Sequence, residues 1–368
     1  MNEGQKRAKA YWRYKHTLSL LGLVASVSYL IIIQFTVVSS HLKIIATSIS
    51  SNFYIAFSIY LLTVSLIYHI VILPLNLYES FILEHKFSLS NQNLLNWVKD
   101  DLKKLAISVI FFIILVETLY AIGKNFKGSW WFVSSIVWII FSIIFTKLFP
   151  IFIIPIFYKY NILSNSQVRN RTLHLAKAFN IKVMDVFEID FSKNTKKANA
   201  ALVGWGDTMR VILADNLIRE FTTEEIEVVV AHEMAHYKLH HIWKLVSIGA
   251  IFTVIFFFIL SRIAQDIAVR MAASDPFDMS IFPACYLLFI LYGIITIPAQ
   301  NGILRKLEKD ADILALKITN LKYAFISLME KLAKKNMSDE NPNALIEFLL
   351  YDHPPIAKRI ALAKKNQS

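Results

Sequence analysis

The sequence predicts a mainly α-helical membrane bundle that carries one small domain of mixed helices and strands. Two observations of composition and pattern support this fold class. Hydrophobic residues make up 56% of the 368 residues and charged residues only 18%, against roughly 45–50% and about 25% in soluble domains. Several apolar runs are also long enough to cross a bilayer, and polar segments interrupt and follow them. One soluble core does not account for this excess of apolar residues.

Six apolar runs are candidate membrane spans, because crossing roughly 30 Å of hydrocarbon takes about 20 helical residues. They cover residues 17–38, 53–75, 105–122, 131–157, 243–264 and 281–299. The first run is too long for a signal peptide and lacks a cleavage site, so we expect it to be retained. Pro150 and Pro155 predict a kink or an early end in the fourth run. Glu117 in the third run indicates a wet interior, since intramembrane carboxylates rarely face lipid.

Lysine and arginine in the short loops predict that both termini are cytoplasmic. The N-terminal arm and the 76–104 connection are basic, whereas the 265–280 loop carries Arg270 against three aspartates. Both large polar segments, and any site on them, then lie on the cytoplasmic side. The expected organisation is four spans in 1–157, a polar domain in 158–242, two spans in 243–299 and a second polar segment in 300–368.

The charge balance and the cysteine content restrict the partners. The net charge of +12 is accompanied by no nucleic-acid-binding motif, so we expect contacts with anionic membrane lipid and none with nucleic acid. Cys285 is the only cysteine and lies in an apolar stretch. A disulfide framework and a thiolate cluster are therefore excluded, and a transition metal would need histidine and carboxylate ligands.

The first polar segment predicts a helix, a strand pair and a second helix. Residues 165–180 have a helical pattern, while 183–191 and 198–214 are rich in strand-forming residues and predict a β-hairpin that turns near Gly206-Asp207. A helix then begins after Thr222, which forms a capping box with Glu225.

This second helix carries an HExxH motif, His232-Glu233-Met234-Ala235-His236. Residues four apart lie on one helical face, so both imidazoles can reach one ion. Glu233, beside the first histidine, is placed to act as a general base toward an attacking water. The competing interpretation is two solvated histidines on a surface helix. The long, well-capped helix and the apolar residues before the motif favour the metal site.

A catalytic zinc site needs a third protein ligand and one open position. Glu308 and Asp312 follow the sixth apolar run and are four residues apart. One of them would bind the metal while the other accepts the second N–H group of a ligand histidine. Their spacing leaves open which carboxylate has which role. An ordinary charged helix leaving the membrane is the alternative interpretation of this pair.

Taken together, these blocks resemble the integral-membrane metallopeptidases of the CAAX prenyl endopeptidase type and, more distantly, the membrane protease HtpX. The matching blocks are residues 74–87 with Asp100 and Lys103, residues 154–160, Asn199-Ala200 with 203–204 and 211–215, the HExxH helix, Glu308-x-x-Ala311-Asp312, and 352–355 with Arg359. Their common order is more specific than any single block. The eukaryotic members of this family carry seven spans, whereas this sequence shows six apolar runs.

The resemblance implies a zincin-like domain of the gluzincin type that holds one Zn²⁺ per chain. It implies Glu308 as the third ligand, after His232 and His236, and Asp312 as the partner of a ligand histidine. Glu233 would be the general base.

The resemblance also places His353 and Arg359 over the active site. There they would bind the substrate carbonyl or the developing oxyanion, which is most effective where water is excluded. The substrate would lie extended beside Asn199-Ala200 and add a strand to that edge.

The expected function is that of a membrane-embedded zinc endopeptidase acting on a peptide or protein, with prenylated CAAX-type peptides as the implied substrates. A membrane quality-control protease without prenyl specificity is the nearest alternative. A non-catalytic transporter or binding protein is the alternative from another class. It predicts intramembrane charges in matched repeat halves, and the sequence contains none.

Overall fold

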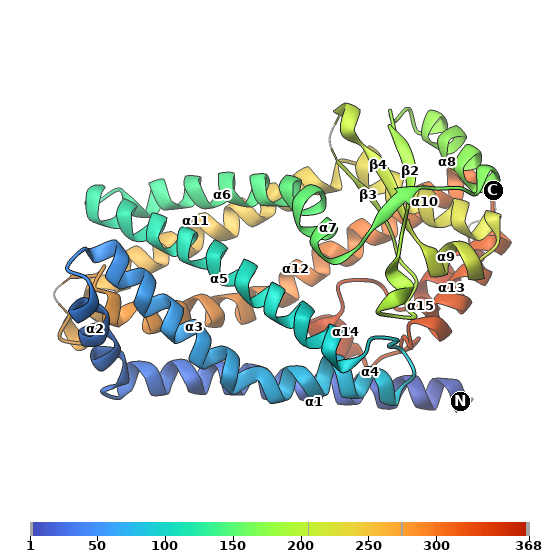
Figure 1. The fold of residues 1–368 in the computed structure, drawn as a ribbon. Coiled ribbons are helices and arrows are strands. Elements are labelled where there is room, and N and C mark those ends of the chain that lie inside the picture. The colour runs from blue at the N-terminus through green and yellow to red at the C-terminus, as the bar shows by residue number, and fades with distance from the viewer. Residues whose placement is uncertain (1–2, 205, 274, 366–368) are drawn as a thin grey trace.

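The computed structural model describes residues 3–204, 206–273 and 275–365. Long helices form a bundle at one end of the molecule, and a small sheet with short helices lies at the other end (Figure 1). Both chain ends lie at the end that carries the sheet (Figure 1).

Six helices among the described residues are long and apolar enough to cross a membrane, which confirms the predicted number. They contain α1 (Glu3–Phe35), α3 (Phe53–Leu77), α5 (Leu94–Asn125), α6 (Trp130–Leu148), α11 (His241–Arg270) and α12 (Phe282–Thr319). Two of them continue without a break, α3 through η1 (Tyr78–Ile82) and α4 (Leu83–Lys86), and α6 through η2 (Phe149–Ile153) and α7 (Ile154–Phe157). The helix α2 (Val38–Ile49), between the first two spans, was not predicted.

In the fourth span, the helix type changes at the two prolines for which a kink or an early end was predicted. Pro150 lies in η2, a π-helical segment, and Pro155 lies in α7. Proline lacks the N–H group for the usual helical bond and crowds the preceding turn, so the helix adjusts there. The α-helical part of the fourth span thus ends at Leu148, a π-helical segment follows, and a kink stays a prediction.

The sheet has four strands in the order β1-β2-β4-β3. They are β1 (Tyr160–Ile162), β2 (Asp185–Ile189), β3 (Ala200–Val203) and β4 (Arg210–Ala214). The predicted hairpin is confirmed as the antiparallel pair β3 and β4, with the 3-10 turn η4 (Gly206–Thr208) between them. Gly204 is needed in this turn, because its φ is +105° and a Cβ there would lie 2.4 Å from the Thr208 carbonyl oxygen. The parallel pairing of β2 with β4 and the strand β1 were not predicted.

Helix α10 (Thr223–Lys238) is the central element of the sheet-bearing domain. It contacts β3, α12 and the helix α8 (Ser166–Ala178). The predicted capping box is present, with Thr222 and Glu225 satisfying each other's backbone N–H groups. Around α10 lie α13 (Lys322–Lys335) and α15 (Ile356–Lys365), and the remaining short elements are η3 (Phe191–Lys193), α9 (Asp215–Glu220), η5 (Met279–Ile281) and α14 (Ala344–Leu350). The shared apolar core therefore supports α10 from several directions.

Candidate active site

The two histidines of the HExxH motif lie on one face of α10. Their Nε2 atoms are 3.1 Å apart, as expected for residues separated by one helical turn. Met234 and Ala235, between them in the sequence, are fully buried on the opposite face. The helix is therefore fixed by its apolar side while both imidazoles converge on the same point.

Helix α12 places a buried carboxylate at that point. Glu308 lies with one oxygen 3.1 Å from His232 Nε2 and the other 3.3 Å from His236 Nε2. One atom from each of these three side chains lies within 4.8 Å of the other two. Glu308 Oε2 is buried and makes no hydrogen bond within the described residues. Two imidazole nitrogens and one carboxylate oxygen are the donor set that zinc takes in catalytic sites, so the residues fit this ion.

Asp312, one turn beyond Glu308, is directed to a different atom. Its Oδ1 lies 2.9 Å from His232 Nδ1. Arg359 on α15 donates to both carboxylate oxygens, at 2.7 Å from Nε and 2.6 Å from Nη2. Asp312 is fully buried. This carboxylate thus orients His232 so that Nε2 faces the site, in the way that carboxylates support metal-bound histidines.

His241, at the start of α11, is a site neighbour that sequence reasoning missed. Its Nδ1 lies 3.0 Å from His236 Nδ1, and the residue is 1% exposed. It gives His236 a partner on the side away from the convergence point, as Asp312 does for His232. The only signal in the sequence was a histidine five residues after the motif, which is too weak to have identified it.

Glu233 lines a cavity of about 170 Å³ together with His232, Asn199 and Ala200. Burial raises the pKa of the Glu233 carboxyl. A pKa shifted upward from the usual range brings a carboxylate closer to the operating pH of a general base. The cavity also has apolar lining residues, among them Leu217, Val228, Val229, Phe325, Leu328 and Met329.

His353 and Arg359 also line this cavity, although they have different surroundings. The His353 side chain is 54% exposed, and its Nε2 lies 3.4 Å from Glu308 Oε1. A hydrogen bond to Asp352 raises the pKa of His353. Arg359, in contrast, has both of its bonding nitrogens on Asp312. Binding of the oxyanion by either residue stays a prediction.

The strand β3 borders the cavity with Asn199 and Ala200 just at its start. It is an edge strand, because only β4 pairs with it among the described strands. The Asn199 carbonyl accepts from Ala214 N–H at 3.0 Å, and the Asn199 side chain accepts from Ala200 N–H. The free side of this edge offers backbone groups to an extended peptide.

Both halves of the chain match known protein families. Residues 163–367 match the model of peptidase family M48, and residues 2–159 match the N-terminal model of CAAX prenyl proteases, described as five membrane helices. The first match covers more than half of the chain, so the chain belongs to peptidase family M48. Within it, the chain is an integral-membrane zinc metalloprotease of the CAAX prenyl protease group.

Similar proteins come from bacteria and eukaryotes. The chain is 26% identical over 314 residues to an uncharacterized metalloprotease, YhfN, of Bacillus subtilis (strain 168), which covers 84% of this chain and 73% of that protein. It is 27% identical over 314 residues to CAAX prenyl protease 1 of Saccharomyces cerevisiae, at 79% and 68% coverage. The crystal structure of S. mikatae Ste24p superposes with a TM-score of 0.86 over 98% of this chain and 88% of that chain, at 23% identity. The last likeness confirms the fold.

Proposed function

We propose that His232, His236 and Glu308 hold one zinc ion and that Glu233 is the general base of peptide-bond hydrolysis. The observation that carries this proposal is the convergence of three ligand atoms within 4.8 Å of one another, beside a buried carboxylate. When bound, the zinc ion acidifies the attacking water and polarises the scissile carbonyl.

The chain's own residues do the rest of the chemistry. Glu233 accepts the proton of the attacking water and then donates it to the leaving amine. Asp312 keeps the Nδ1 side of His232 engaged, so that its Nε2 lone pair stays directed at the ion. His353, on the exposed side of Glu308, donates to the oxygen on which negative charge develops.

The substrate is proposed to lie extended along the free edge of β3, beside Asn199 and Ala200. Backbone hydrogen bonds would then hold it in register, and the cavity beside Glu233 would take one side chain. The apolar lining residues of this cavity favour an aliphatic side chain, because apolar surface buried against them is removed from water.

The proposed substrates are peptides or proteins with a prenylated CAAX-type C-terminus. Two features support this choice over a quality-control protease that acts on unmodified segments. Several relatives are named CAAX prenyl protease 1. In addition, an apolar cavity of about 340 Å³, lined by aromatic side chains of α5, α6, α11 and α12, lies within the bundle. Such a cavity suits an isoprenoid chain, which carries no polar groups.

The test compares one farnesylated peptide with the same peptide bearing a free cysteine thiol. We expect the farnesylated peptide to be cleaved with the higher kcat/KM, and the Glu233→Gln variant to cleave neither. Equal kcat/KM values for the two peptides would contradict prenyl specificity while leaving the peptidase assignment intact. Cleavage of both peptides by the Glu233→Gln variant would contradict the role of Glu233 as the general base.

The sidedness of the chain is a further part of the proposal. Both chain ends and the active site are proposed to be cytoplasmic, which the loop charges and the common position of the two ends support (Figure 1). Reporter fusions at the C-terminus and within residues 266–273 should report opposite sides of the membrane. The same side for both would refute the topology between α11 and α12.

A further inference from the structure

A second large cavity lies away from the catalytic one, at the end of the bundle that adjoins the sheet. It has a volume of about 490 Å³, within the roughly 300–1,000 Å³ of small-molecule sites. Its walls come from α5, from η2 and α7, and from two loop segments around Ser90 and Asn194. It shares no lining residue with the cavity beside Glu233.

The backbone around this cavity is irregular on two sides. The π-helical segment η2 contributes Phe149 and Ile153, and the π-helical segment η1 contributes Ser80. Single π-helical turns inside longer helices frequently mark functional sites. The loop segments close the third side, where Ser90 and Thr195 form a β-bridge.

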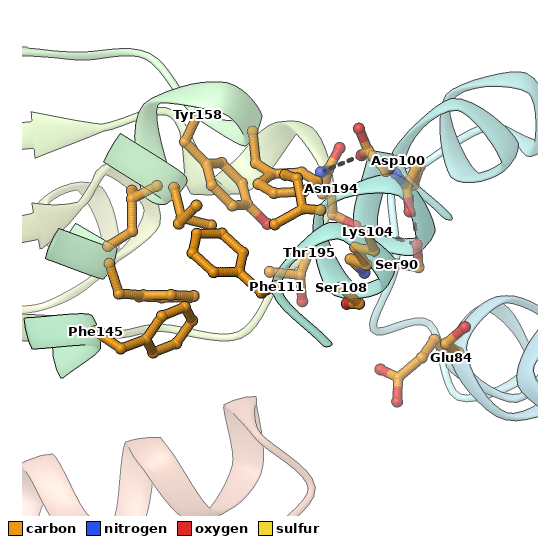
Figure 2. Close-up of a pocket in the computed structure, with 17 residues that line it drawn as sticks. Glu84, Ser90, Asp100, Lys104, Ser108, Phe111, Phe145, Tyr158, Asn194 and Thr195 are labelled. Carbon is orange, nitrogen blue, oxygen red and sulfur yellow. Dashed lines mark hydrogen bonds between the residues drawn. The ribbon is translucent and has the colours of Figure 1, made fainter. Parts of the chain in front are cut away.

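One end of the cavity is polar and carries charges of both signs. Asp100 accepts from the Gln92 amide at 2.7 Å and from the Asn194 amide at 3.3 Å (Figure 2). Both of these donors are neutral, and the one cation paired with this carboxylate among the described residues is the half-exposed Lys103, whose Nζ lies 3.8 Å from Asp100 Oδ1. Lys104, one helical turn further along α5, also lines the cavity and has no hydrogen-bond or ion-pair partner among the described residues.

The other end of the cavity is aromatic. Phe111 and Phe145 lie on the side opposite Asp100 and Lys104 (Figure 2), and Phe149 also lines the cavity. Lys104 directly precedes the apolar run that begins at residue 105. Phe111 is seven residues further along α5, or about 10 Å deeper at the helical rise. The polar end therefore lies at headgroup level and the aromatic end in the hydrocarbon.

We propose that this cavity binds a membrane glycerophospholipid whose zwitterionic headgroup ends in a primary ammonium. Lys104 takes the phosphate, Asp100 accepts hydrogen bonds from the ammonium, and an acyl chain lies against Phe111 and Phe145. Two opposite charges one turn apart match such a headgroup better than a purely anionic one, which Asp100 would repel. A prenyl chain carries no charge and gains nothing from the polar end.

One chain segment connects the lipid cavity with the catalytic cavity. Thr195 lines the lipid cavity, and the same segment continues through Lys197 to Asn199 and Ala200 at the catalytic cavity. Asn216 holds this segment by donating to the Lys197 carbonyl at 2.6 Å. Because the segment is short and anchored, filling the lipid cavity should restrict the start of the edge strand β3.

The experiment measures lipid binding to delipidated protein in detergent by the rise in melting temperature, since a ligand that binds only the folded state stabilises it. Dioleoyl-phosphatidylethanolamine, -phosphatidylcholine and -phosphatidylglycerol are compared at equal mole fraction in mixed micelles. The catalytically silenced Glu233→Gln chain serves as the background, so the result does not depend on the proposed peptidase chemistry.

We expect phosphatidylethanolamine to give the largest rise in melting temperature. Lys104→Gln should weaken this binding about tenfold, as expected for the loss of one contact to a charged group. Lys99→Gln, an exposed lysine of α5 outside the cavity, should bind as the background chain does. Phe111→Ala should weaken binding of all three lipids, whereas Ile110→Ala, at an exposed position outside the cavity, should not.

Several outcomes would overturn the proposal. Equal effects of all three lipids, unchanged in Lys104→Gln, would leave only nonspecific solvation. Strongest binding of phosphatidylglycerol, with a gain in Asp100→Asn, would assign an anionic headgroup instead. Displacement of bound phosphatidylethanolamine by a farnesylated peptide would make the cavity a substrate site. An unchanged titration midpoint for phosphatidylethanolamine in Lys104→Gln, even with a lower lipid-free melting temperature, would exclude Lys104 from the headgroup site.

Discussion

Charged side chains are arranged differently in the peptidase domain and in the membrane bundle. In the peptidase domain five ionisable side chains come together, because Glu308 faces two histidines while Asp312 joins His232 to Arg359. In the bundle, polar side chains such as Ser58 and His69 each contact one carboxylate on a neighbouring helix. Ser58 donates to Glu117 at 2.5 Å, and His69 Nε2 lies 3.1 Å from Asp101.

This difference distinguishes a site from a structural contact. Lys43, for example, lies 2.5 Å from one oxygen of the buried Asp278 and joins two segments, while the other oxygen accepts from the Ser280 backbone and hydroxyl. Convergence of several donors on one point is unfavourable without a cation, because their lone pairs oppose one another. The contrast predicts that substitutions of the converging active-site residues change zinc binding or the rate of cleavage. Substitutions of the paired residues in the bundle should change only the stability of the fold.

The largest effect is expected for the three ligand residues. His232→Ala, His236→Ala and Glu308→Ala should each lose bound zinc and reduce cleavage to background, because each removes one of three protein ligands. Metal analysis of the purified variants checks this result. Asp312→Ala should weaken zinc affinity by only about 10–100-fold. Normal zinc content in Glu308→Ala, with loss in Asp312→Ala, would exchange the two roles.

The next largest effect separates the base from the ligands. Glu233→Gln should retain zinc and lose about 10²–10⁴-fold in kcat, because it removes the proton acceptor and no metal contact. Glu117→Gln is the matched control from the bundle, since its amide oxygen can still accept from Ser58. Turnover near the wild-type rate in Glu233→Gln would refute its role as base.

His353 and Arg359 allow a catalytic role and a structural role to be compared within the active site itself. His353→Ala should keep zinc and fold normally, while the chemical step slows by about 10²–10³-fold, as for loss of one oxyanion donor. Arg359→Ala leaves the buried Asp312 without its ion pair, so we expect a loss of about 3–5 kcal/mol in stability together with weaker zinc binding. Single-turnover rates, zinc content and melting temperature, measured on the same preparations, distinguish a slower chemical step from a loss of stability or zinc.

A different pattern would change these roles. If Arg359→Ala kept zinc and stability but cleaved slowly, the residue would act on the substrate and not through Asp312. If His353→Ala were unstable and its folded fraction cleaved at the wild-type rate, His353 would be a turn-forming residue.

The smallest effects are expected in the bundle. Asp278→Asn removes the charge that pairs with Lys43 and should lower the free energy of unfolding by about 1–3 kcal/mol, the usual cost of losing a hydrogen bond to a charged group. Cleavage per folded molecule should not change. Thermal melting with an active-site titration measures both quantities. A fall in kcat at full folding would show that this outer pair is coupled to the catalytic site.

Much of the fold was predictable because it depends on local patterns. The six spans follow from runs of apolar residues, and the start of α10 follows from Thr222 and Glu225. The hairpin near Gly206 was predicted from flanking strand-forming residues and a turn. The parallel pairing of β2 with β4 was missed, because parallel partners are joined through distant segments and carry no signal of their register.

For the site, the sequence by itself determined the HExxH face, since residues four apart must share one side of a helix. It also placed Glu308 and Asp312 on one face, without deciding between them. Only the tertiary structure turned Glu308 toward the two histidines and gave Asp312 to Arg359, 47 residues away. His241 and the lipid cavity likewise have no local pattern. Such contacts depend on how α10, α12 and α15 pack, and packing is a property of the folded chain.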